Sequence, residues 1–492
     1  MTPLPFFRPT FHSSILYHAR STPHAIAVAF RSQEVSYAEF ARDIERATRQ
    51  LAARVPARSG LAMVSLGHPY LHWVLTIALG RLGLCTVTSY DPSRTLALVR
   101  PDLVFVDASG DASDKRFIAV DEAWIGPGAD TLPAYADPVH QPDAPFRLVL
   151  SSGTTGTPKK VLLTHGLFQQ RLHANLLGSA VTGQSSRTLS LVGLDTAGGH
   201  LLSMGTWTLG GRAVLWMAGE EPYQTIASKG VTYLFLAPVQ LEQLLRAMPP
   251  AALPLTGLTI CTGGSSVPRR LSERVRARLS PTLHIIYGST EAGLMSSCHA
   301  GLADVVPGMT GILRPNVELQ IVDPAGQVLP HGEVGEVRCR SNDCVEGYLD
   351  PDPEQLDSEE IFRDGWFYPG DAGTLSADGV LSIVGRTKEL MNLGGVKIAP
   401  GQVEEALAGC PGVLDIAAFS LEQDGAIPTA WIAVVRGPDY EQAALARVFK
   451  EMFPKLPAPR FVHADLIPRN QMGKIQRNLI QEQVRRSLAG GA

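Results

Sequence analysis

The sequence lacks several features that mark whole classes of protein. It has no run of about 18 uncharged apolar residues, because the best candidate, from His72 onward, is interrupted by Arg81, and no membrane-spanning helix is expected. The N-terminus has no basic segment followed by an apolar core, so a secretory signal peptide is not expected either. The six cysteines are scattered without a C-x-x-C pair, which favours reduced, mostly buried thiols. These absences together indicate a soluble, cytoplasmic protein.

Charge is also scarce and nearly balanced. Charged residues make up 18% of the 492 residues, and 43 lysines and arginines stand against 47 aspartates and glutamates, a net charge of −4. Without a basic excess the chain has no general attraction for a phosphate backbone, so nucleic acid is not an expected partner. Hydrophobic residues reach 45%, which is enough for large cores. The length corresponds to about three domains of ordinary size.

Short aliphatic runs alternate with helical patterns along most of the chain. This alternation is typical of an α/β fold in which mostly parallel sheets are stacked with helices. The expected strands are residues 25–30, 61–66, 103–106, 146–150, 189–192, 231–236, 258–261 and 283–286. The expected helices are residues 37–55, 70–80, 166–177, 239–248 and 268–279.

The pattern changes twice in the second half of the chain. Residues 307–340 alternate between apolar and polar types and carry glycine-rich turns, which predicts a small antiparallel or β-barrel-like subdomain. After Val384 the mixed pattern resumes over about a hundred residues, enough for a small α+β domain. Its expected elements are helices at 402–407 and 441–452 and strands at 414–419, 429–435 and 461–466.

The segment with the most chemistry directly follows the strand at 146–150. It reads Ser-Ser-Gly-Thr-Thr-Gly-Thr-Pro-Lys-Lys over residues 151–160. Hydroxyls, glycines and lysines at this density offer backbone N–H groups and cations to phosphate oxygens. The segment is not a Walker P-loop, because Pro158 stands where that motif requires its second glycine. The alternative is a solvated turn.

Four shorter segments add groups that suit a nucleotide. Residues 287–291, Tyr-Gly-Ser-Thr-Glu, put a ring, a hydroxyl and a carboxylate at the carboxyl end of a strand, where open α/β sheets bind ligands. Asp371 ends the segment 366–371, where it could hold vicinal hydroxyls or simply be a turn residue. Residues 385–389, Gly-Arg-Thr-Lys-Glu, lie at the change of pattern, and Lys474 follows a glycine near the C-terminus.

In this order and spacing, the five segments resemble the adenylate-forming ligase superfamily of AMP-binding enzymes, which includes acyl- and aryl-CoA synthetases. The resemblance implies a large N-terminal domain, a hinge and a small mobile C-terminal domain, here residues 1–385, 386–390 and 391–492. The implied reaction joins a small carboxylic acid to ATP with Mg²⁺, releases pyrophosphate, and then passes the acyl group from the adenylate to the thiol of CoA. The alternative acceptor is a separate phosphopantetheinyl carrier protein.

The resemblance also implies roles for single residues. Lys474 would bridge the carboxylate and the α-phosphate, while Thr290 and Glu291 would hold the α-phosphate and Mg²⁺, Glu291 being the metal ligand. The other residues implied to bind the nucleotide are Ser151, Ser152, Gly153, Thr154, Thr155, Gly156 and Lys159 around the phosphates, Gly263, Gly264, Ser265 and Tyr287 around adenine, Asp371 with Arg386 at the ribose, and Gly288 and Ser289 next to Tyr287.

Movement of the small domain and choice of acid involve further residues by the same resemblance. Lys388 matches the hinge position, and rotation there would remove Lys474 and bring Gly394 and Gly395 to line a channel for the thiol arm. Glycines suit a channel wall because a backbone without Cβ permits close approach. The alternative is a linker with a helix cap.

The acid pocket is implied to lie beside residues 193–200. Asp195 could pair with the ammonium group of an amino acid, or it could be the N-cap of a helix over 196–209. Gly198 and Gly199 would leave room for an aryl or branched acid. A non-catalytic relative is the third functional alternative, and the presence of Glu291, Asp371 and Lys474 argues against it.

Overall fold

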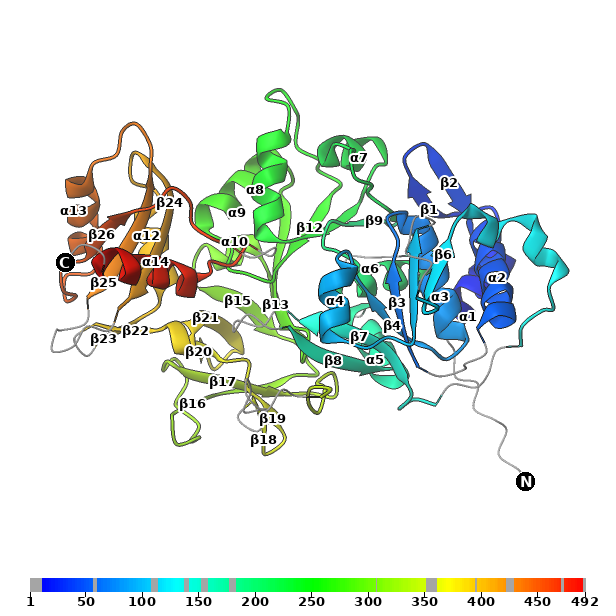
Figure 1. Cartoon of the computed structure of the whole chain (residues 1–492). Helices are drawn as coiled ribbons and strands as arrows, with labels where there is room; N and C mark the ends of the chain where they lie inside the picture. The colour runs from blue at the N-terminus through cyan, green and yellow to red at the C-terminus, as the bar shows by residue number, and fades with distance from the viewer. Residues whose placement is uncertain are drawn as a thin grey trace.

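The computed structural model describes residues 11–55, 60–107, 114–136, 141–151, 158–176, 183–306, 308–350, 361–393, 396–421, 429–469 and 473–489. Within these ranges every strand and helix expected from the sequence is present, with ends shifted by at most three residues. Two large sheets with helices form most of the molecule, and a smaller α+β part lies at one end (Figure 1). The α/β fold is therefore confirmed.

One sheet is built from the first third of the chain. Its strands are parallel except the last, β8, which pairs antiparallel with β7. The carboxyl ends of the parallel strands therefore meet at one edge of the sheet. In spatial order the strands are β6 (Phe117–Val120), β5 (Leu103–Asp107), β3 (Leu61–Ser65), β4 (Cys85–Thr88), β7 (Pro145–Ser151) and β8 (Lys159–Thr164).

The second sheet has a parallel part that continues into an antiparallel part. Its parallel strands, in spatial order, are β1 (Ile26–Phe30), β10 (Arg212–Val214), β9 (Arg187–Ser190), β11 (Tyr233–Leu236), β12 (Thr259–Thr262) and β13 (Thr282–Ser289), with β2 (Gln33–Ser36) antiparallel at the edge. Its antiparallel strands are β14 (Gly293–His299), β15 (Met309–Leu313), β21 (Val380–Arg386), β20 (Asp371–Leu375), β17 (Gly335–Arg340), β16 (Glu318–Val322), β19 (Trp366–Phe367) and β18 (Phe362–Arg363). The antiparallel strands expected over 307–340 thus extend this sheet.

Helices fill the space around the two sheets. Helix α3 (Pro69–Arg81) is buried along nearly its whole length, as its mostly apolar sequence requires. Helix α2 (Tyr37–Arg54) is amphipathic and begins at a capping box between Ser36 and Glu39. The other helices that the structure describes before residue 390 are α1 (Phe11–Ser21), α4 (Pro92–Leu98), α5 (His165–Leu176), α6 (Ala197–Thr208), α7 (Pro222–Ser228), α8 (Pro238–Ala247), α9 (Arg269–Arg278), α10 (Ala300–Ala303) and the 3₁₀ turns Glu122–Ile125, Pro127–Thr131 and Thr387–Glu389.

The small part at one end, here called the C-terminal lobe (residues 396–489), has a hydrophobic core of its own. It lies beside α8 and α9 (Figure 1), and the backbone N–H of Arg269 on α9 donates to Glu405 of the lobe at 3.4 Å. The β22 (Met391–Leu393) and β23 (Val396–Ile398) hairpin leads into it. Its other elements are α12 (Pro400–Leu407), β24 (Val413–Ser420), β25 (Ala430–Arg436), α13 (Gln442–Met452), β26 (Arg460–His463) and α14 (Arg477–Ala489).

Two further expectations from the sequence concern membrane-spanning helices and the cysteines. Among the residues that the structure describes, no helix combines the length and the apolar character that a membrane crossing requires. The six cysteines carry free thiols, and four of them are buried, as the sequence predicted.

Candidate active site

The β7–β8 hairpin carries the described residues of the segment expected to hold phosphates. Ser151 ends β7 and Lys159 begins β8, and the two are directly paired across the strands. Ser152, Gly153, Thr154, Thr155 and Gly156 lie outside the described residues. Burial lowers the pKa of Lys159, while the nearby carboxylate of Glu291 opposes that change. A lysine at the mouth of this hairpin therefore faces the Glu291 carboxylate from the other sheet.

A tyrosine joins the two sheets at this point. The Tyr348 hydroxyl donates to Glu291 Oε1 at 2.9 Å, and Lys159 Nζ lies 3.4 Å from the same hydroxyl. The ammonium group also sits 4.9 Å from the centre of the Tyr348 ring, a cation–π distance. Burial and the neighbouring Glu291 carboxylate raise the pKa of Tyr348, so the hydroxyl keeps its proton. Tyr348 therefore fixes the Lys159 and Glu291 side chains relative to each other.

A buried arginine holds the backbone that carries Thr290 and Glu291. The guanidinium of Arg171, on α5, donates to the carbonyl oxygens of Thr290 at 2.9 Å, Glu291 at 2.7 Å and Asp343 at 2.7 and 2.8 Å. Only 1% of Arg171 is exposed, and burial lowers its pKa to about 10, so it stays charged near neutrality. The Val345 N–H donates to the Glu291 carbonyl as well, at 2.9 Å. This loop is therefore rigidly placed.

A second cluster lies where β13 meets β20 and β21. The Tyr287 hydroxyl donates to Asp371 Oδ2 at 2.6 Å, and Arg386 Nε lies 3.2 Å from Asp371 Oδ1. Asp371 and Arg386 are directly paired on neighbouring strands, and Arg386 also donates to the Pro369 carbonyl. A carboxylate has about four acceptor sites, so Asp371 can still accept from the hydroxyl groups of a ligand. The cluster combines an aromatic face with an oriented carboxylate.

The glycines expected to bind the nucleotide near Tyr287 permit close approaches by neighbouring groups. A Cβ on Gly263 would lie 2.6 Å from the Ile286 side chain, and one on Gly288 would lie 2.4 Å from the Gly293 carbonyl. Gly264 has a φ of +87°, which favours glycine. Ser265 is half-buried in the same loop, and Ser289 Oγ accepts from the Ala292 N–H at 3.0 Å. These residues end β12 and β13 next to Tyr287.

Lys474 reaches this region from the C-terminal lobe. Burial and the positive charge of Arg386 lower its pKa, while Asp371, Glu291 and Glu389 act in the opposite direction. A Cβ on the preceding Gly473 would lie only 2.8 Å from Val239, so the loop carrying Lys474 abuts the start of α8. The structure thus brings together Lys159, Glu291, Asp371, Arg386 and Lys474 from five segments of the sequence.

The residues expected to move the small domain are described only in part. Lys388 is exposed in the 3₁₀ turn Thr387–Glu389, and its charge contributes to lowering the pKa of Lys159. Gly394 and Gly395 lie outside the described residues. The hinge and channel roles therefore stay predictions.

At the expected acid pocket, the N-cap alternative for Asp195 is wrong, and the reason given for placing Gly198 and Gly199 there needs correction. The N-cap of α6 is Thr196, whose side chain accepts from the Gly199 N–H at 3.1 Å, so Asp195 is not the cap. A Cβ on Gly198 would lie 2.7 Å from the Phe235 ring, and one on Gly199 would lie 2.4 Å from the Gly193 carbonyl. The room expected beside these glycines is thus filled by the protein. Their place in the pocket stays a prediction.

Behind Asp195 lies a fully buried arginine, Arg147, on β7. It donates to Thr88 Oγ1 at 3.1 Å and to the Leu194 carbonyl. Its Nε and Nη1 atoms make no hydrogen bond to any protein group that the structure describes. Burial raises the pKa of Asp195, and the positive charge of Arg147 opposes this by favouring the ionised carboxylate. Arg147 thus supports the 193–196 loop from inside.

Sequence reasoning missed three supporting residues. Arg147 left a signal, since it is a single charge within the apolar run 146–150. Arg171 left none, because its importance comes from carbonyl groups more than 100 residues away. Tyr348 follows Gly347 in a segment without other marks, and only its contact with Glu291 identifies it.

Known proteins are similar to this chain over most of its length. The sequence profile of the family described as "AMP-binding enzyme" matches residues 16–349. The indoleacetate–CoA ligase of Aromatoleum aromaticum is 27% identical over 95% of this chain and 97% of its own length. The sulfoacetate–CoA ligase of Cupriavidus necator is 31% identical over 76% of this chain and 77% of its own.

Solved structures show the same fold. The o-succinylbenzoate CoA synthetase of Bacillus subtilis, in complex with its acyl-adenylate intermediate, superposes with a TM-score of 0.83 at 23% identity, covering 96% of this chain and 98% of that one. ATP-bound MatB from Rhodopseudomonas palustris gives a TM-score of 0.82 at 21% identity, with 96% and 99% covered. The chain has clustered groups suited to a nucleotide, the same fold as these enzymes, and a profile match over more than half of its length. It therefore belongs to the AMP-binding enzyme family.

Proposed function

We propose that this protein is an AMP-forming acid–CoA ligase. In the first half-reaction a carboxylate oxygen of the acid attacks the α-phosphorus of ATP, and the bond to the β-phosphate oxygen breaks to release pyrophosphate. In the second, the deprotonated thiol of CoA attacks the acyl carbon and AMP leaves. The observation that carries this proposal is the approach of Lys474 to Asp371 and Glu291, because it brings a cation of the C-terminal lobe to two carboxylates suited to a nucleotide.

The chemical difficulty of the first step is that two anions must meet. Catalysis therefore depends on placing the reactants and neutralising their charge. Lys159 on the hairpin and Lys474 on the lobe supply positive charge on two sides of the site. Tyr287 offers a ring for the base, and Asp371, oriented by Arg386, accepts from the ribose hydroxyls. Arg171 keeps Thr290 and Glu291 in register with these groups.

The donor set also fits a magnesium ion. Mg²⁺ is usually held by one or two carboxylates together with substrate phosphates, and Glu291 is a largely buried carboxylate whose remaining acceptor sites can serve it. Among the described residues, no group of three or more His, Cys, Asp or Glu side chains is suited to hold a metal alone, which agrees with a shared site. When bound, the ion would neutralise charge on the phosphates.

Thioester formation requires that Lys474 leave the site. We propose that residues 386–390 form the hinge before the small domain, which contains the C-terminal lobe, and that Lys388 is the point of rotation. Gly394 and Gly395 would then line the thiol channel. The large domain 1–385 and the small domain 391–492 would move as two bodies.

CoA is the proposed acceptor because the relatives named above are CoA ligases. Residence in the cytoplasm stays a prediction.

The test is acid-dependent exchange of labelled pyrophosphate into ATP, screened over fatty, aryl and amino acids. We expect one class of acid to support exchange in the absence of CoA, and CoA then to give the thioester. A carrier protein bearing phosphopantetheine, added in place of CoA, tests the other acceptor. Absence of acid-dependent exchange throughout the screen would contradict the proposed function.

A further inference from the structure

Lys474 sits on a loop that is closed at its base. The Gln476 N–H donates to the Pro468 carbonyl at 2.9 Å, and Arg469 pairs with Ile475 as an antiparallel bridge. Lys474 follows Gly473, which has a φ of +78°. A long, flexible lysine is useful in catalysis only when its backbone is fixed, because a displacement of about 1 Å can cost about a hundredfold in rate. The loop therefore needs an anchor within the lobe.

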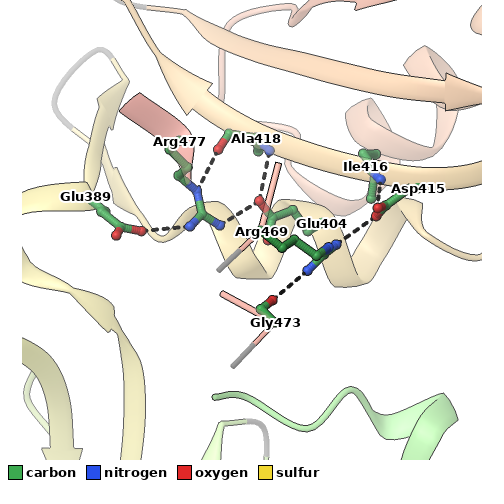
Figure 2. A network of polar contacts seen from close by, with 8 residues as sticks. All are labelled: Glu389, Glu404, Asp415, Ile416, Ala418, Arg469, Gly473 and Arg477. Carbon is green, nitrogen blue, oxygen red and sulfur yellow. Dashed lines mark hydrogen bonds and ion pairs between the residues drawn. The ribbon is translucent and has the colours of Figure 1, made fainter. Parts of the chain in front are cut away.

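Arg469 supplies a bond across this loop. Figure 2 shows its guanidinium between two partners: Nη1 donates to the Gly473 carbonyl at 3.0 Å, and Nη2 to Asp415 Oδ1 at 2.8 Å. Asp415 lies on β24, and the same oxygen accepts the Ile416 N–H at 2.8 Å. The peptide group directly before Lys474 is thus tied, through Arg469 and Asp415, to the sheet of the lobe.

A second arginine secures the other side of the loop. Arg477, three residues after Lys474, donates to Glu404 Oε1 at 2.6 Å and to the Ala418 carbonyl at 3.1 Å. It also binds Glu389 Oε2 at 2.8 Å, next to the proposed hinge residue (Figure 2). Glu404 is largely buried on α12 and also accepts the Ala418 N–H, so this end of the loop is part of the lobe's framework.

The two arginines differ in what they hold. Arg477 binds groups of the lobe's own core and of the hinge, so its loss would weaken the lobe as a whole. Among the described residues, the Arg469 guanidinium binds the Gly473 carbonyl and a half-exposed Asp415, so its loss would free the Lys474 backbone and leave the rest of the lobe intact.

We propose that Arg469 is a positioning residue for Lys474: with Asp415, it holds the Gly473–Lys474 peptide in its adenylation-competent position. The proposal rests on the proposed function, in which Lys474 serves the first half-reaction only. The two Arg469 contacts described above lie within the lobe, so they persist when the lobe moves, whereas the contact of Gly473 with Val239 does not. The loop therefore returns to the site already shaped after each rotation.

The experiment measures both half-reactions in the full-length protein. Acid-dependent pyrophosphate exchange reports adenylation, and thioester formation from the synthetic acyl-adenylate and CoA reports transfer. The variants are R469M, R469K and D415N, with K474A as reference. The matched control is R486M, which removes a surface ion pair to Glu482 on α14 of the same lobe. Melting temperature is recorded for each.

For R469M we expect kcat of exchange to fall roughly 10- to 100-fold, with KM for ATP nearly unchanged and transfer within about twofold of wild type. R469K should recover part of the loss, because one bond can be remade. D415N should likewise lower the rate of exchange and spare transfer, and R486M should lower the rate of neither half-reaction. Equal loss of both half-reactions, or full exchange in R469M while K474A has none, would overturn the proposal. Full exchange in K474A would instead contradict the role given to Lys474 in the proposed function.

Discussion

Removing the hydroxyl of Tyr348 tests the junction between the two sheets most cleanly. In Y348F the ring remains, so its contacts with Phe362, 5.2 Å between ring centres, and with Lys159, 4.9 Å away, are kept. The hydrogen bond to Glu291 is lost. The substitution therefore changes the orientation of one carboxylate with little effect on packing.

The size of the effect follows from that bond. A hydrogen bond to a charged group contributes about 1.5–3 kcal/mol, and the half-buried position of Tyr348 places it near the lower end. Since about 1.4 kcal/mol corresponds to a factor of ten, we expect kcat/KM for ATP in pyrophosphate exchange to fall about tenfold. The 3.4 Å contact with Lys159 Nζ is long and adds little.

The matched control is Y70F, which deletes another tyrosine–carboxylate bond. The Tyr70 hydroxyl donates to Asp43 Oδ2 at 2.6 Å in a buried position outside the candidate site. We expect Y70F to lower the melting temperature at least as much as Y348F and to leave kcat/KM for ATP unchanged. Wild-type exchange kinetics in Y348F would refute the reasoning, and so would an equal kinetic loss in Y70F.

Three further predictions concern Lys474, Lys388 and Asp195. The adenylation rate should fall as pH rises through the pKa of Lys474, which burial and Arg386 hold below its usual 10.5 because they favour the neutral amine. Any activity that remains in K474R should not fall over this alkaline range. A fall at the same pH in both proteins would contradict the assignment. K388P should keep pyrophosphate exchange and lose thioester formation, whereas unchanged thioester turnover would remove the hinge role. D195A should change the ratio of exchange rates between an amino acid and its deaminated analogue by about tenfold, the value of one lost charged hydrogen bond; an unchanged ratio would place Asp195 outside the pocket.

Much of the fold follows from the sequence because its signals are local. Aliphatic runs such as 61–66 lie in sheet cores, and the apolar helix at 70–80 can only be buried, so periodicity predicts both. The cap of α6 was harder to predict, because Asp195 and Thr196 are both good capping residues. The choice of Thr196 depends on the backbone of the 193–196 loop, which the Leu194 carbonyl bond to Arg147 helps to fix.

The candidate site was predictable where the chain marks it with unusual residue combinations. Tyr287, Asp371 and Arg386 were expected at one ligand, and the structure places them in one cluster. The supports were not predictable, because an arginine such as Arg171 or Arg469 acts through backbone carbonyls, and any residue type presents a carbonyl. Which residues hold a catalytic loop is thus decided by the tertiary fold.

The central claim is that the acid attacks the α-phosphorus of ATP. It is tested most directly by labelling both carboxylate oxygens of the acid with heavy oxygen and allowing complete turnover with ATP and CoA. The account predicts that one labelled oxygen appears in AMP and the other in the thioester, with unlabelled pyrophosphate as the second product. Label in orthophosphate together with ADP, or unlabelled AMP, would contradict it.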